Sequence, residues 1–212
     1  MTIIVHKMKP KFWNKGKIYL SNKDKVLKNI ISSYSNEHLN INLNYYHSLI
    51  NSIIGQQISV TAAKSIKNKF FNLHNNITPP NVLNLDMRLL KKCGLSKQKI
   101  MYIRNISSFF IKNKNFIKNI KKYDELFIKE KLIEIKGVGN WTADMFLMFS
   151  FGSPNIFPDG DLGFLKAISK AYKKDLPLNK NYLSKLKKRW SPYNSIATWY
   201  LWRSLDPIAI NY

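Results

Sequence analysis

The chain has 212 residues, enough for one domain or two small lobes, and 45% of them are hydrophobic, which suffices for a buried core. Its formal net charge of +23, from 35 lysines and arginines against 12 acidic residues, favours polyanionic partners such as nucleic acid. The single cysteine, Cys93, excludes an intramolecular disulfide and a four-cysteine iron–sulfur cluster, and no apolar run approaches the roughly 18 residues of a membrane-spanning helix.

Signals for metal binding and for export are also missing from the sequence. The histidines lie at no metal-ligand spacing, so we expect no transition metal. The first ten residues lack the apolar stretch of a signal peptide, which predicts a soluble, cytoplasmic protein, associated with the nucleoid if the source is a bacterium. Most of the basic residues are lysines, a bias that an AT-rich coding sequence also produces. The charge therefore permits nucleic-acid binding without establishing it.

The first quarter of the chain predicts helices separated by polar turns. Apolar residues recur at helical spacing between residues 13 and 33, and Asp24 lies near the start of one helix. Residues 34–42 are mostly polar and predict a loop. A second apolar stripe, residues 49–54, predicts a buried helix face.

The next helices are bounded by capping residues, prolines and glycine. Ser59 is a suitable N-cap for a helix that runs from Thr61 to Phe71. Pro79-Pro80 opens a short helix, and another covers residues 86–93 and ends at Gly94.

A longer amphipathic helix is predicted after Ser96, which caps it. Its apolar side is made of Ile100, Ile103, Ile106 and Phe110. Lys97 and Lys99 lie near its start, where a lysine can meet a phosphate or stay solvated. Residues 113–122 form a lysine-rich connector, and Asp124 begins the helix that follows.

A glycine hairpin joins that helix to the next one. Leu132 and Ile135 are spaced to share a helix face, residues 137–139 (G-V-G) interrupt the helix, and an apolar helical pattern resumes over residues 142–151. Two glycines one residue apart allow a tight turn, and the free amides that open the second helix suit a phosphate. For G-V-G alone, a plain turn between two core helices is the simpler interpretation.

Two further turns predict where the last helices start. The first, residues 157–163 (F-P-D-G-D-L-G), places Asp161 at the N-cap of a helix from Leu162 to about Tyr172. The second is Ser191-Pro192, with serine as the cap and proline at the first helical position. The last helix has an apolar face made of Ile196, Trp199 and Tyr200.

The predicted fold is all-α, because no pattern of period two persists along the chain. No repeat or linker divides the sequence, so residues 1–212 are expected to form a single compact unit with two helical lobes and a central cleft that holds the site. Lobe one is expected to contain about 1–48 together with 161–212. Lobe two is expected from about 49–160, with a helix-hairpin-helix motif at 132–151.

Four short motifs occur in a fixed order along the chain. They are G-Q-Q-I-S-V at 55–60, G-L-S-K-Q-K at 94–99, I-K-G-V-G-N-W-T-A at 135–143 followed by F-P-x-x-D-L at 157–162, and W-S-P-Y at 190–193. Together they resemble the helix-hairpin-helix DNA glycosylases, and within these most closely the DNA-3-methyladenine glycosylase II family, from about Trp13 to Pro207. The resemblance implies base-excision repair: an alkylated purine such as 3-methyladenine is flipped out of double-stranded DNA and released, which leaves an abasic site.

The resemblance also implies which residues contact DNA. The turn at 55–60 enters the minor groove, where Gln57 takes the position of the side chain that fills the gap left by the flipped base; in the best-known member this side chain is leucine. Gln56 and Ser59 flank it, and an ordinary polar turn is the alternative. The hairpin residues expected at DNA are Gly137, Val138, Gly139 and Thr142. The hairpin carbonyls are a candidate site for a monovalent cation, and no other cofactor is expected.

Cleavage of an N-glycosidic bond passes through an oxocarbenium-like sugar, so the enzyme needs negative charge near C1′ and a positioned water. Asp161 can supply both, since a helix N-terminus stabilises a negative charge. The family aspartate likewise precedes a leucine and opens a helix. Asp159 is the nearest rival and Asp144 the next, although Asp144 lies within a helix on a predicted surface. A purely structural cap is the alternative role for Asp161.

By the same resemblance, Trp141, Trp202 and Met145 line the base pocket. Relatives with lyase activity carry a lysine where this chain has Trp141, so the resemblance implies a monofunctional glycosylase. The indole offers a flat surface on which a positively charged alkylated purine gains about 0.5 to 2 kcal/mol. A core tryptophan is an equally good interpretation of Trp202.

Two other functions stay open at this stage. One is a non-catalytic helix-hairpin-helix DNA-binding module, and the other is a glycosylase for oxidised or mismatched bases. A binding module would not need a carboxylate after the hairpin together with an aromatic pocket, so the sequence favours catalysis. We expect a monomer that does not bind membranes.

Overall fold

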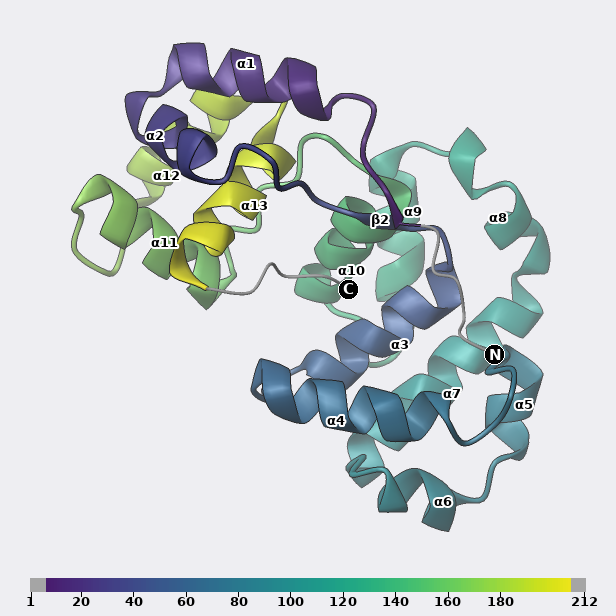
Figure 1. Cartoon of the computed structure of the whole chain (residues 1–212). Helices are drawn as coiled ribbons and strands as arrows, with labels where there is room; N and C mark the ends of the chain where they lie inside the picture. The colour runs from purple at the N-terminus through teal and green to yellow at the C-terminus, as the bar shows by residue number, and fades with distance from the viewer. Residues whose placement is uncertain (1–6, 207–212) are drawn as a thin grey trace. The chain divides into compact units, whose positions relative to one another are not determined.

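The computed structural model describes residues 7–206, which fold as two compact units (Figure 1). The first unit combines residues 7–43 with residues 147–206, and the second consists of residues 44–146. Apart from one pair of two-residue strands, the regular structure of the described residues is helical, so the predicted all-α class is confirmed. Residues 147–160, which the sequence interpretation assigned to lobe two, belong to the first unit.

Helices from both ends of the chain form the first unit. They are α1 (Trp13–Lys23), α2 (Lys25–Ser33), α11 (Leu162–Tyr172), α12 (Lys180–Trp190) and α13 (Asn194–Leu205). The strands β1 (Lys7–Met8) and β2 (Ile41–Asn42) pair antiparallel, and a π-helical turn, η2 (Leu147–Phe151), packs beside β2. Large side chains fill the core, among them Trp13, Phe164, Trp190, Trp199 and Tyr200.

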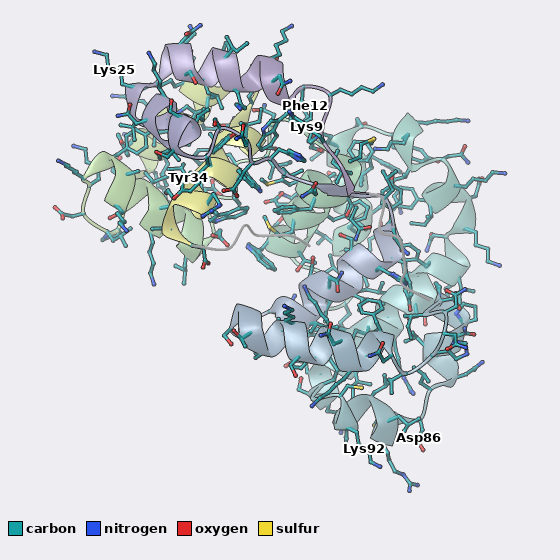
Figure 2. The ribbon with its side chains drawn as sticks, in the orientation of Figure 1. Lys9, Phe12, Lys25, Tyr34, Asp86 and Lys92 are labelled. Atoms are coloured by element: carbon teal, nitrogen blue, oxygen red, sulfur yellow. The ribbon has the colours of Figure 1, made fainter. Side chains whose placement is uncertain are left out.

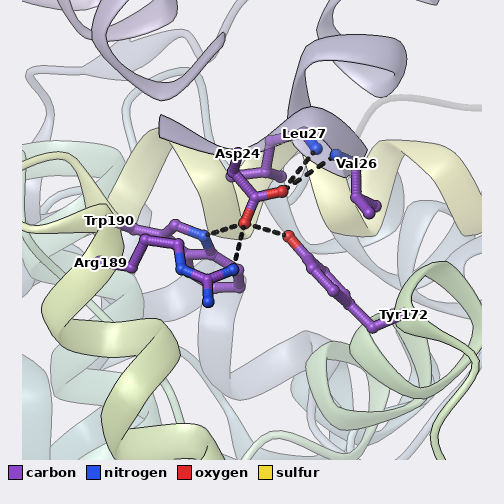
Figure 3. Close-up of polar contacts among 6 residues, drawn as sticks. All are labelled: Asp24, Val26, Leu27, Tyr172, Arg189 and Trp190. Atoms are coloured by element: carbon purple, nitrogen blue, oxygen red, sulfur yellow. Dashed lines mark hydrogen bonds and ion pairs between the residues drawn. The ribbon is translucent and has the colours of Figure 1, made fainter. Parts of the chain in front are cut away.

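Asp24 joins three helices of the first unit (Figure 3). Its Oδ1 caps α2, and its Oδ2 accepts hydrogen bonds from the ends of α11 and α12. The donors are the backbone N–H groups of Val26 and Leu27 (3.0 and 3.2 Å) and the side chains of Tyr172, Trp190 and Arg189 (2.9, 3.0 and 3.3 Å). Burial raises the pKa of Asp24, but these hydrogen bonds, that from Trp190 first, outweigh burial and bring the pKa below its ordinary value. The buried carboxylate is therefore held in its charged form.

The second unit is built around α7 (Lys97–Lys112), which packs against α3, α5, α6 and α8. The other helices of this unit are α3 (Tyr45–Gly55), α4 (Val60–Phe71), α5 (Pro79–Asn84), α6 (Met87–Lys92), α8 (Lys114–Lys118), η1 (Ile120–Lys122, a 3-10 turn), α9 (Glu125–Ile133) and α10 (Asn140–Phe146). The predicted apolar side of α7 is buried, as expected.

Side-chain caps confirm most of the predicted helix starts. Each of these residues accepts a hydrogen bond from a backbone N–H in the first turn of its helix: Asp24, Ser59, Asp86, Ser96, Asp124 and Asp161. The short polar side chains therefore set the local boundaries, as the sequence predicted.

The predicted start of the last helix is wrong. α13 begins at Asn194, whereas Ser191 is the C-cap of α12 and donates its N–H to the carbonyl oxygen of Lys187 at 3.1 Å. Tyr193 then donates its N–H to the carbonyl oxygen of Trp190 at 2.8 Å. Serine and proline here close a turn after one helix instead of opening the next.

The predicted loop and the predicted lysine-rich connector both contain regular structure. β2 lies within residues 34–42, and α8 and η1 lie within the lysine-rich residues 113–122. In the second segment, rings pack where the sequence displays mostly lysine: Phe116 contacts Phe109, Tyr123 and Phe127. These aromatic contacts pack the segment against α7 and α9.

Candidate active site

Asp161 is positioned by the turn that precedes α11. Its N–H donates to the carbonyl oxygen of Pro158 at 2.9 Å, and its own carbonyl oxygen accepts the first helical bond, from Leu165, at 2.9 Å. Its Oδ1 accepts a hydrogen bond from the N–H of Phe164 at 2.6 Å. Backbone on both sides therefore fixes the carboxylate at the positive end of an 11-residue helix.

Trp202 donates a second hydrogen bond to the same carboxylate oxygen, from Nε1 to Oδ1 at 3.1 Å. The indole is 5% exposed, stacks on Phe149 with ring centroids 6.3 Å apart, and meets Phe164 edge to face. Trp202 is thus both a core tryptophan and a direct partner of the predicted catalytic group. No local pattern in the sequence indicates this hydrogen bond, because its partners are 41 residues apart.

Gly163 makes room for this arrangement. A Cβ atom at Gly163 would lie 3.1 Å from Asp161 Oδ1 and 3.6 Å from Trp202 Nε1. A glycine at the second position of a helix is otherwise unfavourable, and that was the available signal that this position matters. The sequence analysis did not single it out.

The two rival carboxylates have different surroundings. Asp159 is exposed in the turn before α11. Asp144 forms an ion pair with Lys129 at 2.6 Å, and its side chain is 15% exposed. Asp144 lies within α10, as expected, but it is only partly exposed, and its charge is compensated by a lysine of α9.

The hairpin between α9 and α10 packs on α7. Gly137 adopts φ +107°, and a Cβ there would lie 2.2 Å from the ring of Tyr102. Asn105 donates to the carbonyl oxygen of Lys136 at 3.0 Å. A Cβ at Gly139, by contrast, would meet nothing within 4 Å, so this glycine leaves open space in front of the backbone. Gly137 is therefore required for packing against α7, whereas the space beside Gly139 is open to another molecule.

Gln56 connects the hairpin to the end of α3. Its Nε2 donates to Thr142 Oγ1 at 3.1 Å and to the carbonyl oxygen of Gly137 at 3.4 Å. Thr142 is 2% exposed and Val138 3% exposed, so the side chains of these two predicted DNA contacts pack inside the second unit. The Gly137 carbonyl oxygen, one of the candidate cation ligands, accepts the hydrogen bond from Gln56 with one lone pair, and the second lone pair remains for a monovalent cation.

The turn between α3 and α4 presents the residues expected to enter DNA. Gln57 is exposed and adopts φ +57°, in the left-handed region. Ile58 is 37% exposed, an apolar side chain at the tip that the sequence analysis passed over. Ser59 instead caps α4 by accepting the N–H of Ala62 at 3.2 Å.

Comparison with known proteins identifies the family. Residues 50–192 match the family described as "HhH-GPD superfamily base excision DNA repair protein". The chain belongs to this superfamily. The matched region includes the turn between α3 and α4, the hairpin between α9 and α10, and Asp161.

Similar proteins share most of its length. DNA-3-methyladenine glycosylase 1 of Schizosaccharomyces pombe is 29% identical over 200 residues, which cover 90% of this chain and 86% of the relative. A putative DNA-3-methyladenine glycosylase of Bacillus subtilis is 28% identical and covers 86% of this chain and 68% of the relative. The structure of an S. pombe 3-methyladenine DNA glycosylase in complex with abasic DNA superimposes with a TM-score of 0.79 at 27% identity, covering 90% of this chain and 96% of that one.

The remaining predicted site residues of this HhH-GPD protein lie in α10. Trp141 is partly exposed at the second position of the helix, and Met145 is completely buried. The structure thus brings together Asp161 and Trp202 in the first unit, and Gln56 with the hairpin in the second.

The positive charge of this HhH-GPD protein is spread over both units. Figure 2 shows the exposed side chains of Lys25 in α2 and Lys92 in α6 extending from the ribbon. Among residues 7–206, no helix has the length and apolar character needed to cross a membrane, and no cluster of three or more His, Cys, Asp or Glu could hold a metal ion. The charge supports attraction to DNA in general and does not mark one site.

Proposed function

We propose that this HhH-GPD protein is a monofunctional DNA glycosylase that flips an alkylated purine such as 3-methyladenine out of double-stranded DNA and hydrolyses its N-glycosidic bond. The observation that carries the proposal is the carboxylate of Asp161, held at the N-terminus of α11 by two hydrogen bonds to one oxygen. The names of its relatives, DNA-3-methyladenine glycosylases of S. pombe and B. subtilis, support the substrate class.

Hydrolysis of the N-glycosidic bond requires a fixed negative charge near C1′ of the sugar. As the bond from C1′ to the base breaks, its electron pair leaves with the base, and positive charge develops on C1′ and the ring oxygen of the sugar. A carboxylate that is already oriented stabilises this charge without reorganising during the reaction. Water then adds to C1′ and transfers a proton, for which the Asp161 carboxylate is the proposed acceptor. The products are the free base and an abasic site.

Two tryptophans are the proposed surfaces for the base. A purine alkylated at a ring nitrogen carries positive charge, and an aromatic face attracts it by about 0.5 to 2 kcal/mol. Trp202 is 5% exposed and donates its Nε1–H to Asp161, and Trp141 is partly exposed in α10. Met145 is completely buried, so any effect on the pocket would pass through the packing of α10.

Trp141 is the reason why we propose glycosylase activity without lyase activity. It stands where lyase relatives have the lysine that forms a Schiff base, and an indole cannot attack the sugar. Borohydride traps such Schiff bases as protein–DNA adducts. We expect the wild-type protein to release bases, leave the strand intact at the abasic site and form no trapped adduct. Trapping at levels comparable to base release would contradict this part.

Asp161→Asn tests the function directly. The change removes the charge that faces the sugar and few contacts to phosphate, so release of bases from methylated duplex DNA should be lost while binding to the duplex stays nearly intact. Asp159→Asn is the matched control, because it removes the same charge from an exposed residue of the same turn. Wild-type turnover by Asp161→Asn would disprove its role.

The alternatives predict other results in the same assay. A non-catalytic DNA-binding module would release no base from any substrate. A glycosylase for oxidised or mismatched bases would act on duplexes with those lesions and spare the methylated one. We further propose a monomer, and light scattering of the purified protein checks this.

A further inference from the structure

Lys99 makes two hydrogen bonds inside the second unit. Its Nζ donates to the carbonyl oxygen of Ile54 at 2.8 Å and to that of Gln56 at 2.9 Å. Ile54 lies in the last turn of α3, and Gln56 is the C-cap of that helix. Burial lowers the pKa of Lys99. The lysine, which the sequence placed at a phosphate or in solvent, instead points to the end of a neighbouring helix.

The ammonium group of Lys99 offsets the negative partial charge at the C-terminus of α3. The last carbonyls of a helix have no partners within the helix and carry its negative partial charge. The Ile53 carbonyl oxygen accepts the N–H of Gln56 at 3.3 Å. The Ile54 carbonyl and the next one beyond the helix, that of Gln56, both accept from the ammonium group of Lys99, which is a favourable arrangement for a cation.

The residue after this contact adopts an unfavourable backbone conformation. Gln57 has φ +57°, which residues other than glycine avoid because their Cβ approaches the following carbonyl. Such a conformation persists only where the surroundings fix it, and it recurs at functional sites. On one side of Gln57 the bonds to Gln56 fix the backbone, and on the other Ser59 does so by capping α4.

The same contact also reaches the hairpin. Lys99 holds the backbone of Gln56, and the side chain of Gln56 holds Thr142 and the Gly137 carbonyl. One residue, Gln56, therefore ties together the exposed turn and the glycine hairpin, and Lys99 fixes that residue from α7.

We propose that Lys99 is a positioning residue for base flipping: it fixes the exposed Gln57–Ile58 turn in the conformation that fills the gap left by the flipped base. The inference rests on the proposed function, because flipping precedes release. Filling the gap offsets the loss of base stacking, and a turn that is ordered beforehand loses less entropy on insertion. A loose turn would insert less often, whereas the hairpin keeps its own contacts with Tyr102 and Asn105 of α7, and the Asp161 carboxylate is untouched.

Lys97 provides the matched control. It is exposed at the first position of the same helix, so Lys97→Met removes the same charge from the same helix end without touching α3. Lys99→Met keeps the length of the stem and removes the donor. Lys99→Arg keeps the charge and the ability to donate to two carbonyls, and it should restore most of the activity.

The experiment measures single-turnover release of 3-methyladenine from two duplexes. In one the lesion is paired, and in the other it lies opposite an abasic site, where flipping costs less. Loss of hydrogen bonds to a charged group corresponds to a decrease of about tenfold or more, so Lys99→Met should slow release from the paired duplex by that factor. The deficit should shrink on the second duplex. The fluorescence of a 2-aminopurine next to the lesion should show less unstacking, and affinity for undamaged duplex should change no more than in Lys97→Met.

Two results would overturn the proposal. One is equal release by Lys99→Met and Lys97→Met, and the other is an equal deficit on both duplexes. If Lys99→Met fails to fold, Lys99→Gln takes its place, since its shorter, uncharged side chain removes the ammonium group from the Ile54 and Gln56 carbonyl oxygens. An equal deficit on both duplexes again rejects the proposal, and a selective deficit supports it. Failure of the wild type to release any base would instead reject the proposed function, so the two failures are distinguishable.

Discussion

Replacement of Trp202 by phenylalanine removes one donor from the Asp161 carboxylate and keeps a ring next to Phe149. The lost hydrogen bond is 3.1 Å long, and the indole is 5% exposed, so water does not readily replace it. Hydrogen bonds to charged groups contribute about 1.5 to 3 kcal/mol, and each 1.36 kcal/mol is about tenfold in rate. If the bond fixes the oxygen in the orientation that the transition state requires, Trp202→Phe should slow base release by about 10- to 150-fold.

Trp199→Phe is the control for this prediction. Trp199 lies in the same helix and is 1% exposed, and its Nε1 has no hydrogen-bond partner among the described residues. The substitution therefore makes the same change in size without affecting Asp161. The assay is single-turnover release from methylated duplex DNA, with thermal unfolding of both variants beside it. Equal effects of Trp202→Phe and Trp199→Phe on the rate would refute the reasoning, because loss of packing would then explain both.

Three further predictions follow from the glycines and from Asp24. Gly163→Ala places a Cβ 3.1 Å from Asp161 Oδ1, the proposed catalytic group, and should slow base release by about tenfold or more without lowering the melting temperature. Gly137→Ala forces a Cβ against Tyr102 at φ +107° and should lower the unfolding free energy by more than about 1 kcal/mol, whereas Gly139→Ala should keep the stability and weaken binding to undamaged duplex, measured by fluorescence anisotropy. Asp24→Asn should lower the unfolding free energy at neutral pH by at least about 1.5 kcal/mol. Because the folded-state pKa of Asp24 is depressed, its stabilisation is complete above the ordinary value of 3.8 and is lost as the pH falls through the lower folded value, so the difference in melting temperature between wild type and variant should shrink in acid. A constant difference down to the lowest accessible pH would contradict this last prediction.

Local signals predicted local structure well. Asp161 was identifiable because a proline and glycine turn precedes it and an apolar helix follows, and an N-cap depends only on residues within one helical turn. The start of α13 was misjudged for the opposite reason. Ser195, in its first turn, donates its N–H to the carbonyl oxygen of Pro154 at 3.0 Å and its hydroxyl to that of Ser153 at 2.7 Å. A partner some forty residues away decides where this helix begins.

The hydrogen bonds of Asp161 with Trp202 and of Lys99 with Gln56 could not be predicted from the sequence, because their partners also lie far apart in the chain. Trp202 is separated from Asp161 by 41 residues, and Lys99 is separated from Gln56 by 43. The local sequence pattern of a lysine near a helix start is the same whether its ammonium group contacts solvent, a phosphate or the end of another helix. Only the packing of α7 against α3 selects the last of these.

The division of the chain also has a consequence for its synthesis. The second unit is one continuous stretch that ends at residue 146, whereas the first unit needs both ends of the chain, including α13 with Trp202. Ribosomes add about 5 to 20 residues per second, so the roughly 60 residues that complete the first unit take about 3 to 12 s more. During that interval the nascent chain contains every residue of the second unit but lacks Trp202, the partner of the Asp161 carboxylate. We therefore expect a chain truncated before α13 to release no base from methylated duplex DNA, because the first unit and its carboxylate site are completed last.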